Sequence, residues 1–194
     1  DQGLTEALQP RHIITAHSAY LHSFHERFTE DLRGIRESRP PFVEPGLLRW
    51  LEDEVGVLSQ LIESCAAFGE ALTKPVHGDL WLNNILWESR STWHLVDWDD
   101  LRIGDPAADL AALIGPTADD PRPLKMLGQA EGGLTSAERE RLPYLGRATL
   151  LDWVIDPVAD WIEARVSPPH ERDIRAAKEG IHKRALSCYR ALYR

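Results

Sequence analysis

The chain of 194 residues has little of several residue types that mark other classes of protein. Its two cysteines, Cys65 and Cys188, lie far apart in helix-like patterns, which predicts free thiols in a reducing compartment; a disulfide between them has no support in the pattern. No apolar run approaches the ~18 residues that span a bilayer, and the N-terminal segment lacks the basic and apolar regions of a secretory signal. We therefore expect a cytoplasmic protein with no membrane partner.

Basic charge is also scarce. The 22 Lys and Arg residues are outnumbered by 31 Asp and Glu residues, which gives a formal net charge of −9 and a pI near 5.3. No basic run is present, and nucleic-acid binding depends on clustered Lys and Arg, so we expect no nucleic-acid partner. The hydrophobic fraction of 43% and charged fraction of 27% are typical of a folded globular domain with a real core.

Helical spacing of apolar residues dominates the chain and predicts helices at about 11–29, 46–72, 143–166 and 169–193. Asp105-Pro106 is a helix start, and Thr135 with Glu138 forms a capping-box pattern. Between the helices, residues 85–87 and 93–98 are typical of two short strands joined by a turn-rich segment. The predicted fold class is mainly α (α+β): a helical bundle with one small inserted β-hairpin.

Acidic and amide side chains gather around this hairpin. Asn84 follows Asp79 by five residues across a loop, and Asp97 closes the second strand. A hairpin brings its two ends together, so Asn84 and Asp97 can approach each other with Asp79 facing them. Such oxygen ligands suit Mg²⁺, which keeps several waters and needs few protein ligands. The alternative is that these residues serve only as turn and cap residues, a role that Asp and Asn often have.

Three motifs occur here in sequence order: H-G-D-x-x-x-x-N at 77–84, V-D-W-D at 96–99 and G-D-P-x-x-D-L-A at 104–111. Together they resemble the aminoglycoside phosphotransferase and choline kinase-like superfamily, whose catalytic lobe is related to that of protein kinases. The resemblance implies a protein-kinase-like C-terminal lobe. It also implies ATP-dependent transfer of the γ-phosphoryl group to a hydroxyl of a small molecule, which is aminoglycoside-, choline- or sugar-like, with ATP and Mg²⁺ as cofactors.

The resemblance assigns roles by position. Asp79 would be the catalytic base that accepts the proton of the substrate hydroxyl, and Asn84 and Asp97 would bind Mg²⁺ and, through it, the nucleotide phosphates. Structural support would come from His77 beneath the loop and from Asp105 and Asp109 on the following helix. Trp81 replaces a His that many members carry two residues after the Asp. Trp81 and Asp99 are candidate substrate contacts.

The resemblance also implies a nucleotide-binding N-terminal lobe, and its features are missing. No G-x-G-x-x-G array occurs, and the pattern predicts no strand before the catalytic loop that carries one of the four lysines. We expect residues 1–194 to form a single C-terminal lobe: 1–74 helical, 75–104 the catalytic loop and metal-binding hairpin, and 105–194 the helical substrate side. Because the lone methionine is Met126, the chain is expected to be a processed product or a fragment, unless it is a natural single-lobe protein. It would be inactive alone and open to self-association through the exposed cleft face.

Two further clusters have both a functional and a structural interpretation. Asp152, Asp156 and Asp160 recur every four residues beside Trp153 and Trp161, so this helix face could receive a cationic substrate through charge and cation–π contact. A solvated acidic face with tryptophans in the core explains the same pattern. His22 and His25 could share a zinc ion, but the sequence offers no third ligand, and a packed or surface helix is the interpretation that the pattern favours.

Two alternatives to the kinase hypothesis remain open at this stage. The lobe could be a non-catalytic binding or regulatory module, which would bind a small cation or a partner protein without turning over nucleotide. The acidic pair Asp79 and Asp97 could also support metal-assisted phosphate hydrolysis without ATP. The sequence does not identify the phosphate acceptor, because acidity suits amines but also serves solubility.

Overall fold

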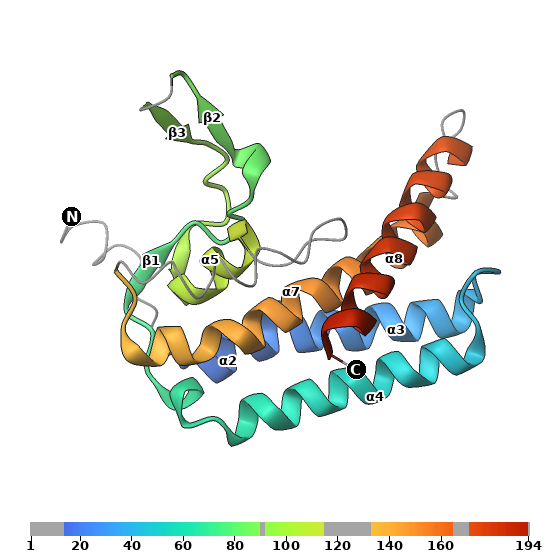
Figure 1. The fold of residues 1–194 in the computed structure, drawn as a ribbon, viewed down its shortest axis with the longest axis horizontal. Helices are drawn as coiled ribbons and strands as arrows, with labels where there is room; N and C mark the ends of the chain where they lie inside the picture. The colour runs from blue at the N-terminus through green and yellow to red at the C-terminus, as the bar shows by residue number, and fades with distance from the viewer. Residues whose placement is uncertain (1–13, 90–91, 115–132, 165–170, 194) are drawn as a thin grey trace.

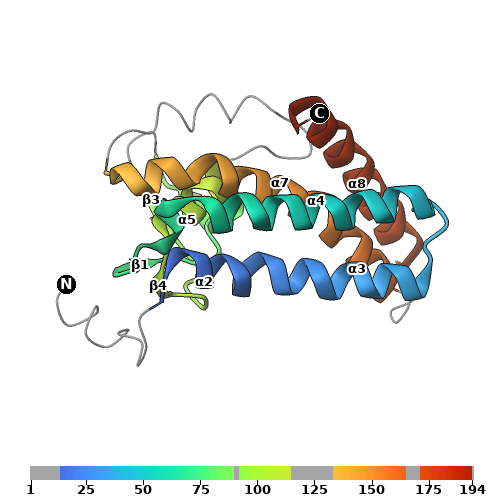
Figure 2. The same cartoon turned by 90° about the horizontal axis from the view of Figure 1, so that it is seen from below.

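The computed structural model describes residues 14–89, 92–114, 133–164 and 171–193. Long helices lie along the body of the molecule, and a short helix with two small β-ribbons stands at one side of them (Figure 1). Viewed from below, α4 runs side by side with the N-terminal helices (Figure 2). The predicted fold class, a helical lobe with small antiparallel ribbons, is confirmed.

The N-terminal helical segment runs without a break through α2 (Ala16–Tyr20), the π-helical turn η1 (Leu21–His25) and α3 (Glu26–Ser38). It begins at a Thr15–Ser18 capping box and ends at Arg39, whose φ of 49° is left-handed. The helix extends about nine residues past the predicted end at 29, because buried Leu32 and Ile35 continue its apolar stripe. The predicted residues before 14 lie outside the described part.

The second long helix, α4 (Pro45–Ser64), is shorter than the predicted 46–72. Its apolar stripe is buried against the bundle at Leu51, Val55, Leu58 and Ile62. The chain turns extended at Cys65, with φ −87° and ψ 113°, and then forms the 3₁₀ turn η2 (Ala66–Gly69). The apolar pattern continued past the true end because Phe68 is buried from the 3₁₀ turn.

Two antiparallel ribbons carry the segment with the three motifs. The predicted hairpin is present as β2 (Ile85–Trp87) and β3 (Trp93–Leu95), although β3 ends three residues earlier than expected. A second ribbon pairs β1 (Lys74–Val76) with β4 (Arg102–Gly104) and was not predicted. Three-residue strands so far apart in sequence show no alternation that a pattern could detect. The catalytic-loop segment leaves β1 and returns through β4.

The C-terminal half contains α5 (Pro106–Ile114), α7 (Ser136–Glu163) and α8 (Glu171–Tyr193). The predicted capping box of Thr135 and Glu138 is present and starts α7 seven residues before the expected start at 143. Pro143 therefore lies inside the helix, in its second turn. Most of the predicted loop at 115–134 and the predicted break at 167–169 lie outside the described residues.

Helix α7 is the centre of the core and packs against α3, α4, α5 and α8. Its middle presents a wide apolar face to these helices, while Asp152, Asp156 and Asp160 lie on another face. The fully buried residues there are Ala148, Leu150, Leu151, Val154, Ile155 and Val158. None of the described helices combines the length and the apolarity that crossing a membrane would require.

The new ribbon makes a testable demand on Gly104. A Cβ atom at Gly104 would lie 2.4 Å from Cγ2 of Val76, a buried side chain on the paired strand. Gly104→Ala should therefore lower the free energy of unfolding by about 1–3 kcal/mol through overpacking. Chemical denaturation of the variant measures this. Gly34→Ala is the matched control, since open space surrounds Gly34 on α3; it should stabilise the protein by roughly 0.5–1 kcal/mol. Equal effects of the two substitutions would contradict the packing described here.

Candidate active site

The loop of residues 77–84 connects β1 to the hairpin through the 3₁₀ turn η3 (Leu82–Asn84). Gly78 has φ +86°, and a Cβ there would lie 2.4 Å from the backbone oxygen of Asp100. Only glycine satisfies both conditions without strain. The loop therefore passes against the backbone of the turn that follows the hairpin, and this close approach brings the motif segments together.

Asp109, in the first turn of α5, holds the start of this loop. Its Oδ2 accepts a hydrogen bond from the backbone N–H of His77 at 2.7 Å, and its Oδ1 accepts one from Gly78 at 3.0 Å. Burial raises the pKa of Asp109, and the two N–H donors act in the opposite direction. The sequence suggested that Asp109 braces the helix; the structure places its carboxylate on the loop backbone.

His77 ties the loop to the end of the hairpin. Its ring is buried, with Nε2 2.9 Å from the backbone oxygen of Val96, so Nε2 is the donor in this bond. The imidazole centroid also lies 4.6 Å from the ring centroid of Trp98. His77 therefore supports the loop from below, the kind of role that the resemblance implied, and fixes it relative to the segment that carries Asp97.

Asp79 and Asn84 face each other across the loop. The Nδ2 of Asn84 donates to the backbone oxygen of Asp79 at 2.8 Å and to its Oδ2 at 3.1 Å. Asn84 is 6% exposed, whereas Asp79 is exposed to solvent. The buried amide thus orients an exposed carboxylate, which is an arrangement suited to a base that must reach a substrate.

A backbone hydrogen bond holds the residue before Asp97 against Asn84, the other predicted metal ligand. The N–H of Val96 donates to the backbone oxygen of Asn84 at 3.0 Å, and the exposed Asp97 follows with φ +64°. A left-handed non-glycine residue is uncommon, and such strained residues concentrate at functional sites. Asn84 uses its amide nitrogen on Asp79, so these bonds leave its oxygen for a cation.

The predicted ligands suit a Mg²⁺ ion that keeps several waters, rather than an ion enclosed entirely by protein side chains. Asn84 and Asp97 offer an amide oxygen and a carboxylate, the hard ligands that Mg²⁺ accepts while keeping water and phosphate oxygens. Within the described residues, no group of three or more His, Cys, Asp or Glu side chains is placed to hold a metal. A cation at this pair would therefore need most of its remaining ligands from water and from a bound phosphate.

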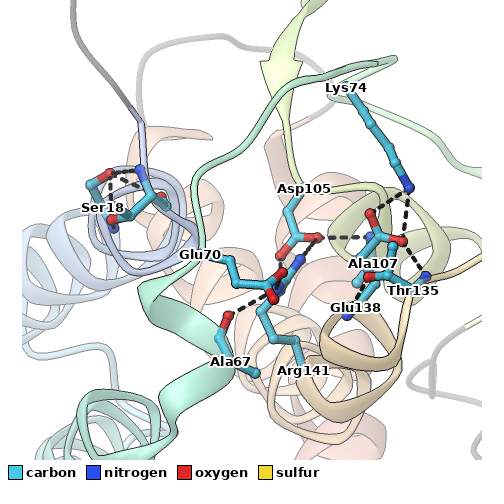
Figure 3. Close-up of polar contacts among 10 residues, drawn as sticks. Ser18, Ala67, Glu70, Lys74, Asp105, Ala107, Thr135, Glu138 and Arg141 are labelled. Atoms are coloured by element: carbon cyan, nitrogen blue, oxygen red, sulfur yellow. Dashed lines mark hydrogen bonds and ion pairs between the residues drawn. The ribbon is translucent and has the colours of Figure 1, made fainter.

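Asp105 is buried and makes two kinds of contact. Its Oδ1 accepts the N–H of Ala107 at 3.0 Å, which caps α5. Both oxygens also bind Arg141 of α7, with Oδ2 2.7 Å from Nε and Oδ1 3.0 Å from Nη2 (Figure 3). The sequence indicated the cap. It gave no signal for Arg141, because a helix–helix ion pair 36 residues apart leaves no local pattern.

The candidate substrate contacts fall into two places. Trp81, on the loop, and Asp99, after the hairpin, are both exposed. Asp152 and Asp156 lie on α7, facing Asp31 of α3, and Asp152 Oδ1 lies 2.7 Å from Arg27 Nη2. The acidic row is thus shared with α3, a partnership that the sequence did not show.

The tryptophans beside this row belong to the protein interior. Trp161 is buried, with its ring 5.4 Å from that of Phe42 and under the guanidinium of Arg175. Trp153 is partly buried against the core. The last carboxylate of the row, Asp160, is paired with Lys178 of α8. The core interpretation of these tryptophans is the one that the packing supports, so an aromatic receptor for a cation would have to form elsewhere.

The remaining candidates have local partners. His22 Nδ1 lies 3.3 Å from Glu26, and His25 Nδ1 lies 2.7 Å from Ser59 Oγ, so the two rings engage different neighbours. Cys65 and Cys188 are both free thiols.

Comparison with known proteins gives the family. A model described as "Phosphotransferase enzyme family" matches residues 7–145, well over half of the chain and all of the catalytic-loop segment. The chain belongs to this phosphotransferase family. The resemblance to the aminoglycoside phosphotransferase superfamily is therefore confirmed.

One curated protein that this chain is similar to is a viomycin phosphotransferase from Streptomyces vinaceus. The two sequences are 37% identical over 84 residues, which is 41% of this chain and 27% of the relative. The matched segment thus spans about a quarter of the relative's length. No solved structure gave a significant match.

The acidic cluster on α3 and α7 gives a prediction about pH. Burial is the main cause that raises the pKa of Asp152 to about 7 and that of Asp31 to about 6; Arg27 lowers both. Protonated carboxyls are then favoured in the folded state. Their stabilising contribution is present below the ordinary pKa of 3.8 and is lost as the pH rises to about 7. Asp152→Asn should therefore lose less stability than the wild type between about pH 5 and pH 8, opening a gap in Tm of about 2–4 °C.

Thermal unfolding at a series of pH values measures this gap. Asp53→Asn, an exposed substitution on α4, is the matched control and should follow the wild type at every pH. If Asp152→Asn and the wild type show the same dependence of Tm on pH across the whole range, the raised pKa of Asp152 is contradicted.

Proposed function

We propose that this phosphotransferase moves the γ-phosphoryl group of ATP to a hydroxyl of a small molecule, with Asp79 as the base. The observation that carries the proposal is the Asp79–Asn84 contact, in which a buried amide orients an exposed carboxylate five residues before it. Phosphoryl transfer depends mostly on positioning and on charge stabilisation. A carboxylate held by its own loop, with its second oxygen free of the Asn84 bond, can accept the hydroxyl proton as the oxygen attacks.

Mg²⁺ would be held by Asn84 and Asp97. It would neutralise charge on the nucleotide phosphates, while the two protein ligands fix its place relative to Asp79. His77 supports this arrangement because it contacts the backbone immediately before Asp97. Asp109 supports it from the other side through the loop amides. These contacts fix the loop that carries Asp79 and Asn84, and they fix it relative to the segment just before Asp97.

The acceptor is proposed to be a small hydroxylated molecule that carries positive charge. Support comes from the exposed ring of Trp81 and the exposed carboxylate of Asp99 in the motif segments. The Asp31–Asp152–Asp156 cluster on α3 and α7 adds to this only if a cation displaces Arg27 from Asp152. Aminoglycosides, choline and amino sugars have this chemistry, and the name of the relative adds viomycin to the acceptors worth assaying. Acceptors are best compared by kcat/KM in one assay, since specificity is a ratio of these values.

The face around the loop is proposed to be a contact surface. Large exposed apolar side chains gather there, at Trp81, Leu82, Leu86, Trp87, Trp93 and Trp98. The hairpin that carries several of them stands clear of the helices (Figure 1). Several large apolar side chains exposed within one segment are typical of an interaction site. In this phosphotransferase we expect the face to be covered by a nucleotide-binding lobe or, where none is present, to promote self-association.

The role of Asp79 can be tested in any form of the protein that turns over ATP. Asp79→Asn removes the base but keeps a side chain of the same shape, so kcat should fall by about 10²–10⁴-fold. Because Asp79 is exposed, the free energy of unfolding should change by no more than about 0.5 kcal/mol. Coupled detection of ADP gives the rate, and chemical denaturation gives the stability.

Asp100→Asn is the matched control, since Asp100 is an exposed carboxylate in the neighbouring turn with no assigned role. It should retain kcat within a factor of about two or three. Near-wild-type turnover in Asp79→Asn would remove Asp79 from the mechanism. Release of phosphate from phosphate esters with Mg²⁺ alone would instead indicate hydrolysis at Asp79 and Asp97, and the absence of turnover with every nucleotide and acceptor would favour a non-catalytic module.

Nucleotide affinity gives a second test, on the chain of 194 residues itself. The predicted metal ligand Asp97 and the base Asp79 are exposed, and the described residues supply few groups that could close over a triphosphate. We therefore expect Mg-ATP to bind weakly, with a Kd above about 1 mM. This corresponds to a binding free energy no stronger than about −4 kcal/mol. Isothermal titration calorimetry measures this. A micromolar Kd would contradict the expectation and would show that this lobe alone holds nucleotide.

A further inference from the structure

We infer that Lys74, Glu138 and Arg141 are positioning residues for the catalytic loop, acting together with Asp105 as a four-charge clamp. This inference rests on the proposed function, because it concerns the placement of Asp79. Lys74 and Asp105 lie side by side at one end of the β1–β4 ribbon, since Lys74 is paired in register with Gly104, the residue before Asp105. The catalytic loop leaves the other end of the same ribbon, after Val76.

The clamp consists of two ion pairs. In one, Lys74 of the ribbon is the cation and Glu138 of α7 the anion; in the other, Asp105 is the anion and Arg141 of α7 the cation. Lys74 Nζ lies 2.7 Å and 3.0 Å from the two carboxylate oxygens of Glu138. Asp105 makes the bidentate pair with Arg141 described above. Glu138 and Arg141 are three residues apart on α7, so they share one face of the helix and meet the two strands together (Figure 3). Each of the four charges therefore has a partner of opposite sign.

The geometry ties both strands to the most buried helix of the fold. Arg141 is 1% exposed and also donates from Nη1 to the backbone oxygen of Ala67, just before the segment that leads into β1. Glu138 accepts the N–H of Thr135 as well, so it belongs to the cap of α7. The Lys74 ammonium and the Thr135 donor hold the pKa of Glu138 below its ordinary value although burial acts to raise it. A displacement of the ribbon end would leave buried charges without partners, which is strongly unfavourable.

Two routes lead from the clamp to Asp79. Along β1, Lys74 is three residues before His77, the first residue of the loop. Through α5, Asp105 caps the helix whose first turn carries Asp109, and Asp109 binds the amides of His77 and Gly78. Strand and helix thus approach the loop from its two sides, and α7 holds both. A change at Arg141 or Glu138 should reach the loop without touching any reacting group.

Hydrogen exchange at the His77 and Gly78 amides tests this clamp without nucleotide or substrate. We expect Arg141→Gln and Glu138→Gln to accelerate exchange at these two amides by about tenfold or more. Glutamine also serves as the third residue of a capping box, so Glu138→Gln removes the charge pair and keeps the cap of α7. Amides in the centres of α4 and α8 should change by less than about threefold. Mass spectrometry or NMR of the whole chain provides all of these rates.

Arg147→Gln is the matched control, because Arg147 is a second, partly buried arginine of α7 and binds Glu54 of α4 and Tyr189 of α8 instead. It should accelerate exchange in α4 and α8 without singling out the loop. Equal acceleration everywhere in the Arg141 and Glu138 variants would show a merely structural role and overturn the inference. Unchanged exchange at His77 and Gly78 would overturn it as well.

Variants of Lys74 provide a second test of the clamp in case Arg141→Gln does not fold. The Lys74 side chain is 43% exposed, so its substitutions should be tolerated. Lys74→Gln should accelerate exchange at His77 and Gly78, and Lys74→Arg should restore the wild-type rates because it keeps the charge on Glu138. Failure of Lys74→Arg to restore them would contradict the clamp. Because no turnover is measured, a loss of the proposed function through Asp79 would leave this result unaffected.

Discussion

The arrangement of the candidate site depends on one carboxylate that binds two consecutive backbone amides. Asp109 accepts from His77 and Gly78, and those residues immediately precede Asp79. The loop can follow this path because Gly78 adopts a left-handed conformation and has no Cβ atom to collide with the backbone of Asp100. Asp109 thereby fixes the loop relative to α5. The cap residue of α5, Asp105, fixes that helix to the core through Arg141. A loop on its own would have no such reference, because loops are the mobile parts of a fold.

The buried and the exposed polar residues of the candidate site have different roles. His77, Asn84, Asp105 and Arg141 are each buried and have partners inside the protein. Asp79 and Asp97, which would react or bind metal, are exposed. Burying a charge is unfavourable unless it is paired, so the paired charges hold the scaffold and the reacting ones face the solvent side. Preorganisation of exposed groups by a buried layer of partners is what phosphoryl transfer requires.

Sequence patterns predicted the parts of this structure that depend on neighbouring residues. The hairpin, the Asp105 cap and the Thr135–Glu138 capping box are local, and all three are present. The β1–β4 ribbon was missed because its strands have three residues each and pair across a long stretch of chain. Arg141 was missed for a related reason: nothing in a helix sequence shows that one arginine is buried on an aspartate of another helix. The motif spacing that marked Asp79, Asn84 and Asp97 is the exception, because it reflects long-range geometry that the family resemblance carries.

The same distinction explains the acidic row on α7. Spacing of four residues correctly placed Asp152, Asp156 and Asp160 on one face, but spacing does not show what that face meets. It meets α3, where Arg27 neutralises one carboxylate and Asp31 adds another. Such a row is neither a solvated surface nor an open receptor, because Asp152 and Asp156 share Arg27 in a partly dehydrated place and Asp160 is paired with Lys178. A cationic ligand could bind there only by replacing Arg27 as the counter-ion of Asp152. Any affinity of this surface for amines would therefore depend on pH in the range where Asp152 titrates, and would weaken when Asp152 is protonated.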